Sequence, residues 1–331
     1  MFKKIKSFYQ HLKMNILGST RISLSIPIGT IKYKIYECPG LWCSDSELQK
    51  ITNDLNIIAK NCHGDKDIPE YGVLEGNRED MSKRLITIAY DRKTKKPIGF
   101  SAQIFLDLID GNFHEKILHL GLIYVDKSVR GKNITYLLSV FPNLLIVLKN
   151  GFRDIWISNV TQVPAVVGLV SQNYLDVYPN IDNNAQSFYH KRLGELIIKD
   201  HNHSFGVGKD ASYESEKQII RNAYTGGSDN LKKTFAEAPK HRNEKINELC
   251  ESSLDYNRGD DFLQLGRLST FGFIRLYKGK IGSGNILTLS ITFISVFCMS
   301  IFVPIVRWMI PMDSVNNNKI EESFKNIILK D

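Results

Sequence analysis

The stretch that decides the fold is Ile117–Leu138, which reads ILHLGLIYVDKSVRGKNITYLL. Its first half, up to Val125, is almost entirely apolar and is typical of a buried β-strand. Its second half is a polar turn centred on Arg130–Asn133 (RGKN), followed by a helical pattern. A strand that ends in a basic, glycine-containing turn and opens a helix presents free backbone N–H groups and a positive dipole end. The sequence therefore predicts a phosphate-binding joint here.

The totals of the chain fit a folded protein with an anionic partner. Of its 331 residues, 43% are hydrophobic and 24% are charged, both close to globular averages. The formal net charge of +8 favours nucleic acid, a phosphorylated cofactor or an acidic membrane surface, although solvated lysines would explain it equally well. The five cysteines form no CxxC pair, so we expect reduced thiols rather than a disulfide framework or a zinc site.

The elements around the joint alternate between strands and helices. Before it, the patterns predict a strand, a helix and then three antiparallel strands, at Ile31–Tyr36, Ser44–Ala59, Arg84–Tyr90, Ile98–Leu108 and Ile117–Val125. After it come a helix kinked or restarted at Pro142, a short strand and a second helix, at Thr135–Leu148, Asp154–Val160 and Pro164–Gln172. The connection between Val125 and Asp154 has the length of a parallel βαβ crossover. The fold class is therefore α/β, with a mixed sheet flanked by helices.

The joint carries a resemblance to a known family. The sequence from Val125 to Thr135, VDKSVRGKNIT, resembles the central motif of the GCN5-related N-acetyltransferase (GNAT) superfamily, Val-x-Pro-x-x-Arg-Gly-x-Gly-x-Gly between an apolar strand and a helix. The resemblance covers about residues 30–180, including the order of elements. Lys127 stands where Pro is common, and Asn133 and Thr135 stand where the family prefers Gly. Asn tolerates positive φ best among non-glycine residues, and Thr can cap a helix start.

The resemblance implies that the chain binds acetyl-CoA or another acyl-CoA as a co-substrate and transfers the acyl group to an amine by direct attack. In such enzymes the central strand bulges and splays from its parallel neighbour, and its backbone holds the pantetheine arm and the thioester carbonyl. Carried over, the cofactor-binding residues are Ile123, Tyr124 and Val125 for the arm, Arg130, Gly131, Lys132, Asn133, Ile134 and Thr135 for the pyrophosphate, and Asn159 and Thr161 beside the arm. A solvated basic turn is the alternative for Arg130 and Lys132.

The same resemblance suggests two catalytic residues. Several family members have a Glu base six residues before the motif's Val, where this chain has His119, whose imidazole has an ordinary pKa of ~6.5. The alternative is a histidine that satisfies a neighbouring backbone group in a half-buried strand. The family often places a Tyr acid on the helix after the next strand. Its usual position is occupied here by Leu169, which leaves Tyr174 as the candidate, followed by Tyr124 and Tyr136.

Beyond the resemblance, residues 181–280 are predicted to be a partly helical extension of the GNAT-like domain, residues 26–180. His201 and His203 form an HxH pair, but no third ligand motif lies near, so no metal is expected. Residues 211–256 are polar and basic with few interleaved aromatic residues, a composition that argues against single-stranded nucleic-acid binding.

The ends of the chain suggest a membrane. Ile286–Val306 contains no charged residue, and as a helix it would span about 31 Å, close to the ~30 Å of a hydrocarbon core. We expect a transmembrane helix, with a buried core or dimer-interface helix in a soluble protein as the alternative. Basic residues before it place the large N-terminal part in the cytoplasm. Residues 1–25 form a basic amphipathic lead-in without a signal peptide, and residues 307–331 form a short polar tail.

The sequence thus predicts a membrane-anchored acyltransferase that uses an acyl-CoA. The alternative is a tethered CoA-binding or interaction module that has lost catalysis, which the missing motif glycines and the absent helix tyrosine favour.

Overall fold

The computed structural model describes residues 23–64, 68, 72–129, 134–150, 153–182, 185–226 and 228–269. These residues belong to one compact unit, Arg21–Gly282. Within this described part, no helix combines the length and the apolar character needed to cross a membrane. The predicted span Ile286–Val306 and the tail after it lie outside the described residues, as does most of the lead-in, so the membrane anchor stays a prediction.

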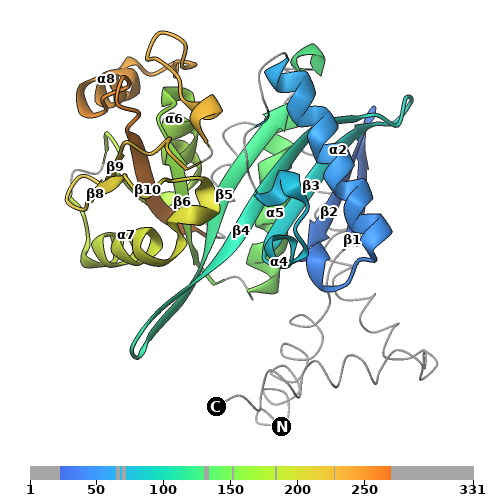
Figure 1. Cartoon of the computed structure of the whole chain (residues 1–331), viewed down its shortest axis with the longest axis horizontal. Helices are drawn as coiled ribbons and strands as arrows, with labels where there is room; N and C mark the ends of the chain where they lie inside the picture. Colours follow the sequence, from blue (N-terminus) through green and yellow to red (C-terminus); the bar gives the residue numbers. More distant parts are fainter. Residues whose placement is uncertain are drawn as a thin grey trace. The chain divides into compact units, whose positions relative to one another are not determined.

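One mixed sheet organises the described part of the chain (Figure 1). Its strands lie in the order β1-β2-β3-β4-β5-β6-β10-β9-β8, and β7 also pairs with β10. The strands are β1 (Ser23–Ile28), β2 (Ile31–Glu37), β3 (Arg84–Asp91), β4 (Pro97–Asp110), β5 (Phe113–Val125), β6 (Ile155–Thr161), β7 (Leu175–Tyr178), β8 (Ser212–Glu214), β9 (Ile219–Arg221) and β10 (Asp261–Leu268).

Helices cover both faces of the sheet, as the sequence predicted. They are α2 (Asp45–His63), α3 (Gly72–Glu75), α4 (Arg78–Met81), α5 (Ile134–Lys149), α6 (Pro164–Asn173), α7 (Phe188–His201) and α8 (Glu244–Ser253). Short 3₁₀ turns also occur in the described part, at η2 (Pro39–Leu41), η3 (Lys127–Val129), η4 (Asn202–Phe205) and η5 (Asp229–Leu231). The α2 helix begins at a capping box made by Ser44 and Glu47, where the sequence placed its start.

The strand pairings confirm the mixed sheet. β1 to β5 pair antiparallel in chain order, and β5 and β6 are parallel across the α5 crossover. The structure adds β10, which pairs antiparallel with β6 along its whole length. The sheet therefore continues past residue 180, where the sequence analysis had placed the end of the GNAT-like domain.

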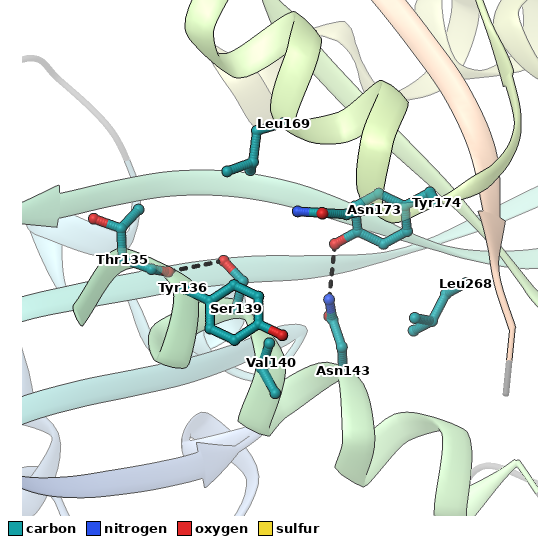
Figure 2. A pocket seen from close by; sticks show the side chains of 9 residues that line it. All are labelled: Thr135, Tyr136, Ser139, Val140, Asn143, Leu169, Asn173, Tyr174 and Leu268. Atoms are coloured by element: carbon teal, nitrogen blue, oxygen red, sulfur yellow. Dashed lines mark hydrogen bonds between the residues drawn. The ribbon is translucent and has the colours of Figure 1, made fainter. Parts of the chain in front are cut away.

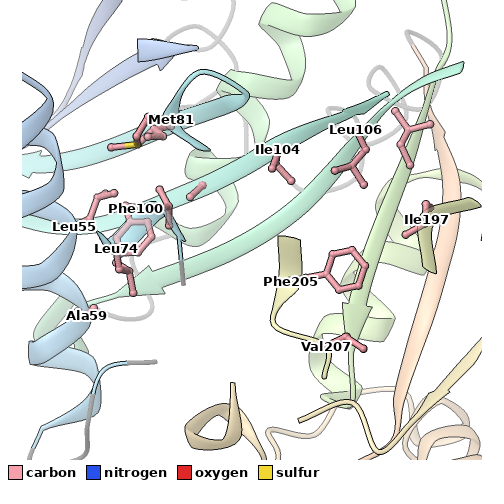
Figure 3. Close-up of a cluster of buried hydrophobic side chains, with 14 of the residues drawn as sticks. Leu55, Ala59, Leu74, Met81, Phe100, Ile104, Leu106, Ile197, Phe205 and Val207 are labelled. Carbon is pink, nitrogen blue, oxygen red and sulfur yellow. The ribbon is translucent and has the colours of Figure 1, made fainter. Parts of the chain in front are cut away.

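The two faces of the sheet differ in what covers them. Side chains that alternate along β4, among them Phe100, Ile104 and Leu106, join an apolar cluster with α2 and α7 (Figure 3). The side chains between them face α5, where Ser101 and Gln103 hydrogen-bond. We call these the α2 face and the α5 face.

The α5 helix shows how the sheet supports an imperfect helix. It runs from Ile134 to Lys149 without restarting at Pro142. Because proline has no N–H, the carbonyl of Leu138 four residues earlier loses its helical partner. The hydroxyl of Ser101 on β4 donates to that carbonyl at 2.8 Å, and both residues are fully buried. A side chain of β4 thus satisfies the carbonyl that the proline leaves without a partner inside the helix.

Candidate functional site

The carboxyl halves of β5 and β6 separate. Among the described residues the two strands pair at Leu118 with Ile157 and at His119 with Ser158. Two residues after His119, Gly121 has φ +57°, and a Cβ built there would lie 2.0 Å from the carbonyl oxygen of Ala102. Only glycine fits this position, and the β4–β5 register shifts beside it, which marks a β-bulge. Beyond the bulge β5 continues against β4 while β6 continues against β10. The bulged and splayed central strand is the feature that the family resemblance implied.

Two helices follow the separating strands. β5 leads into α5, described from Ile134, and β6 leads into α6 at Pro164. Parallel strands bring these two helix starts to the same edge of the sheet, where helix dipoles favour negative charge. Ile134 is buried and Thr135 is exposed. The four residues assigned to the pyrophosphate, Arg130, Gly131, Lys132 and Asn133, lie outside the described residues, so their role stays a prediction.

A pocket lies between α5 and α6 on the α5 face (Figure 2). Its volume is about 440 Å³, including its open mouth. It starts at the first turn of α5 and extends down to the end of β10. Its lining residues are Thr135, Tyr136, Ser139, Val140, Asn143, Leu169, Asn173, Tyr174 and Leu268. Aliphatic and aromatic groups dominate this wall, which suits an extended ligand with few polar atoms.

A buried polar chain ends at this pocket. Gln103 Nε2 donates to Asn143 Oδ1 at 3.0 Å, and Asn143 Nδ2 donates to the hydroxyl oxygen of Tyr174 at 2.7 Å (Figure 2). Since the Tyr174 oxygen accepts that bond, its proton can be donated to a molecule in the pocket. Burial raises the pKa of Tyr174 far above its ordinary value, so the hydroxyl stays protonated. The predicted catalytic tyrosine therefore lies in the pocket wall as a hydrogen-bond donor.

His119, the predicted base, lies below the splay and inside the core. Its side chain is 2% exposed, its Nδ1 lies 3.0 Å from Ser158 Oγ, and its ring stacks on Phe205 with centroids 4.9 Å apart. Burial, with the charges of Arg84 and His201, lowers its pKa to about 3. A sealed imidazole with so low a pKa is a poor acceptor for the proton of an amine. The geometry thus supports the alternative reading of His119 as a polar core residue, here satisfied by Ser158, and its role as the base stays a prediction.

The end of α2 is joined to the splayed end of β5. Three consecutive residues of the helix contact three consecutive residues of the strand and the turn after it. The contacts are Asn61 Nδ2 to Asp126 Oδ2 at 3.1 Å, Cys62 Sγ to the Val125 carbonyl at 3.4 Å, and His63 Nε2 to Tyr124 Oη at 2.8 Å. His63 was not among the residues predicted from the sequence, because the helix was expected to end at Ala59 and because the partners lie more than sixty residues apart.

The two polar residues predicted beside the cofactor arm are buried and bonded within the protein. Asn159 Nδ2 donates to Gln264 Oε1 at 3.4 Å, and Thr161 Oγ1 accepts from the Val163 N–H at 3.1 Å, just before α6. They thus support the start of α6. His201 of the HxH pair has its Nε2 2.9 Å from the Asp107 carbonyl, and the described residues contain no cluster of three metal-ligating side chains.

Comparisons with known proteins give structural matches alone. No family model matches the chain, and none of the curated proteins matches it. Among solved structures it is similar to a fungal GCN5-related glucosamine N-acetyltransferase region, at 19% identity over 40% of this chain and 14% of that one, with a TM-score of 0.26. It is also similar to the ribosomal-protein-S5-alanine acetyltransferase from Vibrio fischeri, at 9% identity over 73% of this chain and 95% of that one, with a TM-score of 0.30. A third match is the NatC complex bound to Gag peptide and CoA, at 19% identity over 43% of this chain and 80% of that one, with a TM-score of 0.29. At these TM-scores the matched structures assign no role to any residue of this chain.

Proposed function

We propose that the chain transfers an acyl group from an acyl-CoA to an amine. The observation that carries this proposal is the bulged, splayed strand at Gly121, with two helices starting at the same edge and a pocket between them. The strand supplies backbone groups at Ile123–Val125, which lie beyond the last described β5–β6 pair, His119 with Ser158. Such groups can hold the amides of a pantetheine arm and the carbonyl of a thioester.

The pocket suits the acyl-CoA in character. The largely apolar wall between α5 and α6 can take up the arm or the acyl chain, and the polar chain that ends at Tyr174 supplies a donor there. When bound, the thioester provides an activated carbonyl. The chain's own residues then have to hold the carbonyl, accept a proton from the amine and return one to the sulfur. Tyr174, whose hydroxyl lies in the pocket wall at the end of that polar chain, is our candidate for the last role.

One observation favours a second function, a CoA-binding module without catalysis. Leu169 lines the pocket at the helix position where the resemblance would place an acid tyrosine. Binding and turnover therefore have to be measured separately.

Binding is tested by titrating the full chain with acetyl-CoA and with CoA in a calorimeter. Leu169→Trp adds bulk inside the pocket and should weaken binding about tenfold or more. Ile57→Trp is the matched control, because Ile57 is an exposed aliphatic residue of α2, 48% exposed, and should bind like the wild type. Thermal unfolding of both variants checks that they fold.

Turnover is tested by thiol release from acetyl-CoA with a panel of peptide N-terminal amines, lysine esters and polyamines. Release that depends on the amine supports a transferase, whereas binding without release supports the module. If the chain does not bind acetyl-CoA at about millimolar concentration, both the transferase and the CoA-binding module are refuted.

A further inference from the structure

We propose that His63 and Tyr124 together accept the proton of the attacking amine, on the face of the sheet opposite the pocket. This inference rests on the proposed transferase function and identifies the residues that would act on its acceptor.

Tyr124 occupies the splayed half of β5. It lies between Ile123 and Val125, whose backbone is the candidate holder of the thioester. Its ring meets Phe100 of β4 edge-on, with centroids 5.4 Å apart, and meets His63 in the same manner at 5.3 Å. Because Phe100 belongs to the apolar cluster under α2, the Tyr124 side chain lies on the α2 face. The candidate carbonyl site and the Tyr124 side chain thus belong to the same three residues of β5.

The donor pocket and this pair lie on opposite faces. Ser101 and Gln103, which alternate with Phe100 along β4, point to α5, and the pocket lies between α5 and α6. With the donor in that pocket, we place the attack on the thioester carbon on the α2 face. The polar pair on that face is Tyr124 Oη and His63 Nε2, 2.8 Å apart.

The exposure of these groups suits an acceptor that comes from solution. His63 and Tyr124 are both half-buried, whereas His119 is 2% and Tyr174 8% exposed. His63 is the last residue of α2. The titratable groups nearest along the two elements are Lys60 and Cys62 on α2 and Asp126 after β5, the last bonded by Asn61.

The proton path follows from the 2.8 Å contact between His63 Nε2 and Tyr124 Oη. The lone pair of a neutral amine attacks the thioester carbon, a C–N bond forms, and the C–S bond breaks with its electron pair leaving on sulfur. The surplus proton on nitrogen passes to Tyr124 Oη while the tyrosine's own proton passes to neutral His63. The thiolate takes a proton from Tyr174 or from water, His63 gives its proton to water, and a Tyr174 that has donated regains a proton from water. Amine and thioester thus give amide and thiol with no other reactant.

The experiment compares His63→Ala and Tyr124→Phe with the full wild-type chain, using acetyl-CoA and the same amine panel. Positioned proton acceptors contribute about 10²–10⁴-fold, so kcat should fall about 100-fold or more in both variants. The Kd for acetyl-CoA should stay within about twofold, since neither side chain lines the pocket. Imidazole added to the assay should restore part of the kcat of His63→Ala. The matched control is His114→Ala, because the His114 side chain is 65% exposed at the far end of β5 and should keep wild-type kcat.

Each outcome bears on a different claim. If His63→Ala and Tyr124→Phe keep kcat within about threefold of the wild type, the pair is refuted while the transferase stands. If imidazole speeds His114→Ala as much as His63→Ala, the rescue is not specific and the pair is also refuted. If the wild type binds acetyl-CoA but releases no thiol with any amine, the transferase function is refuted. The same holds if it binds no acetyl-CoA. In both cases the proposed role of His63 and Tyr124 is refuted as well.

Discussion

Replacing Ser101 by Ala tests whether the hydrogen bond from β4 stabilises the α5 helix at Pro142. The Ser101 hydroxyl donates at 2.8 Å to the Leu138 carbonyl, which proline leaves without its helical partner, and both residues are 0% exposed. Removing the hydroxyl leaves a carbonyl buried and without this donor, at a cost of about 1–3 kcal/mol of unfolding free energy. In a Pro142→Ala background the backbone N–H of residue 142 returns and can satisfy the same carbonyl. There the loss of the Ser101 hydroxyl should cost less than about 1 kcal/mol.

The assay is equilibrium unfolding in urea, followed by tryptophan fluorescence, for the wild type, the two single variants and the double variant. The expected coupling between the two sites is about 1 kcal/mol or more. Ser252→Ala serves as the control, because its hydroxyl donates to the Glu248 carbonyl on exposed α8, and it should change stability by less than about 0.5 kcal/mol. Equal costs for Ser101→Ala in both backgrounds would refute the reasoning.

Two further predictions concern buried charge. Asp80 accepts two hydrogen bonds from Arg84, whose side chain is 1% exposed, so Asp80→Asn should cost about 3 kcal/mol or more in the same urea assay. A loss below about 1 kcal/mol would contradict a buried pair. Burial raises the pKa of Asp261 to about 8. Between about pH 4 and pH 8 the folded state therefore holds a proton that the unfolded chain releases. This group's contribution to the stability of the fold is lost as the pH rises through that range. Asp261→Asn should therefore lose less stability than the wild type between about pH 5 and pH 8, and parallel losses would show that Asp261 ionises normally.

Much of the site's framework could be predicted from the sequence, because its signals are local. The apolar run before Val125, the turn after it and the βα alternation follow from periodicity and connection length over a few tens of residues. Gly121 lies in that stretch, but its function in the bulge depends on the Ala102 carbonyl of the neighbouring strand. The sequence could supply the glycine but not the oxygen that excludes every other side chain.

The surroundings of the candidate catalytic residues could not be predicted from the sequence, because spacing along a strand does not show how deeply a side chain is buried. His119 lies at the predicted distance before Val125, yet Phe205, almost ninety residues later, covers its ring. His63 carries no local signal and becomes a candidate only because α2 ends against Tyr124. Tyr174 was placed by analogy alone, and its connection to Gln103 through Asn143 joins three separate elements.

By itself, therefore, the sequence determined the α/β order of elements, the strand that splays and the helix that follows it. These features depend on backbone periodicity and on turn chemistry that nearby residues carry. The tertiary structure alone decided that β10 pairs with β6, that Ser101 supports the helix across Pro142, that His119 is sealed in the core, and that His63 lies against Tyr124. Each of these depends on burial and on contacts between residues far apart in the chain, and pairings of that kind are fixed when the core closes.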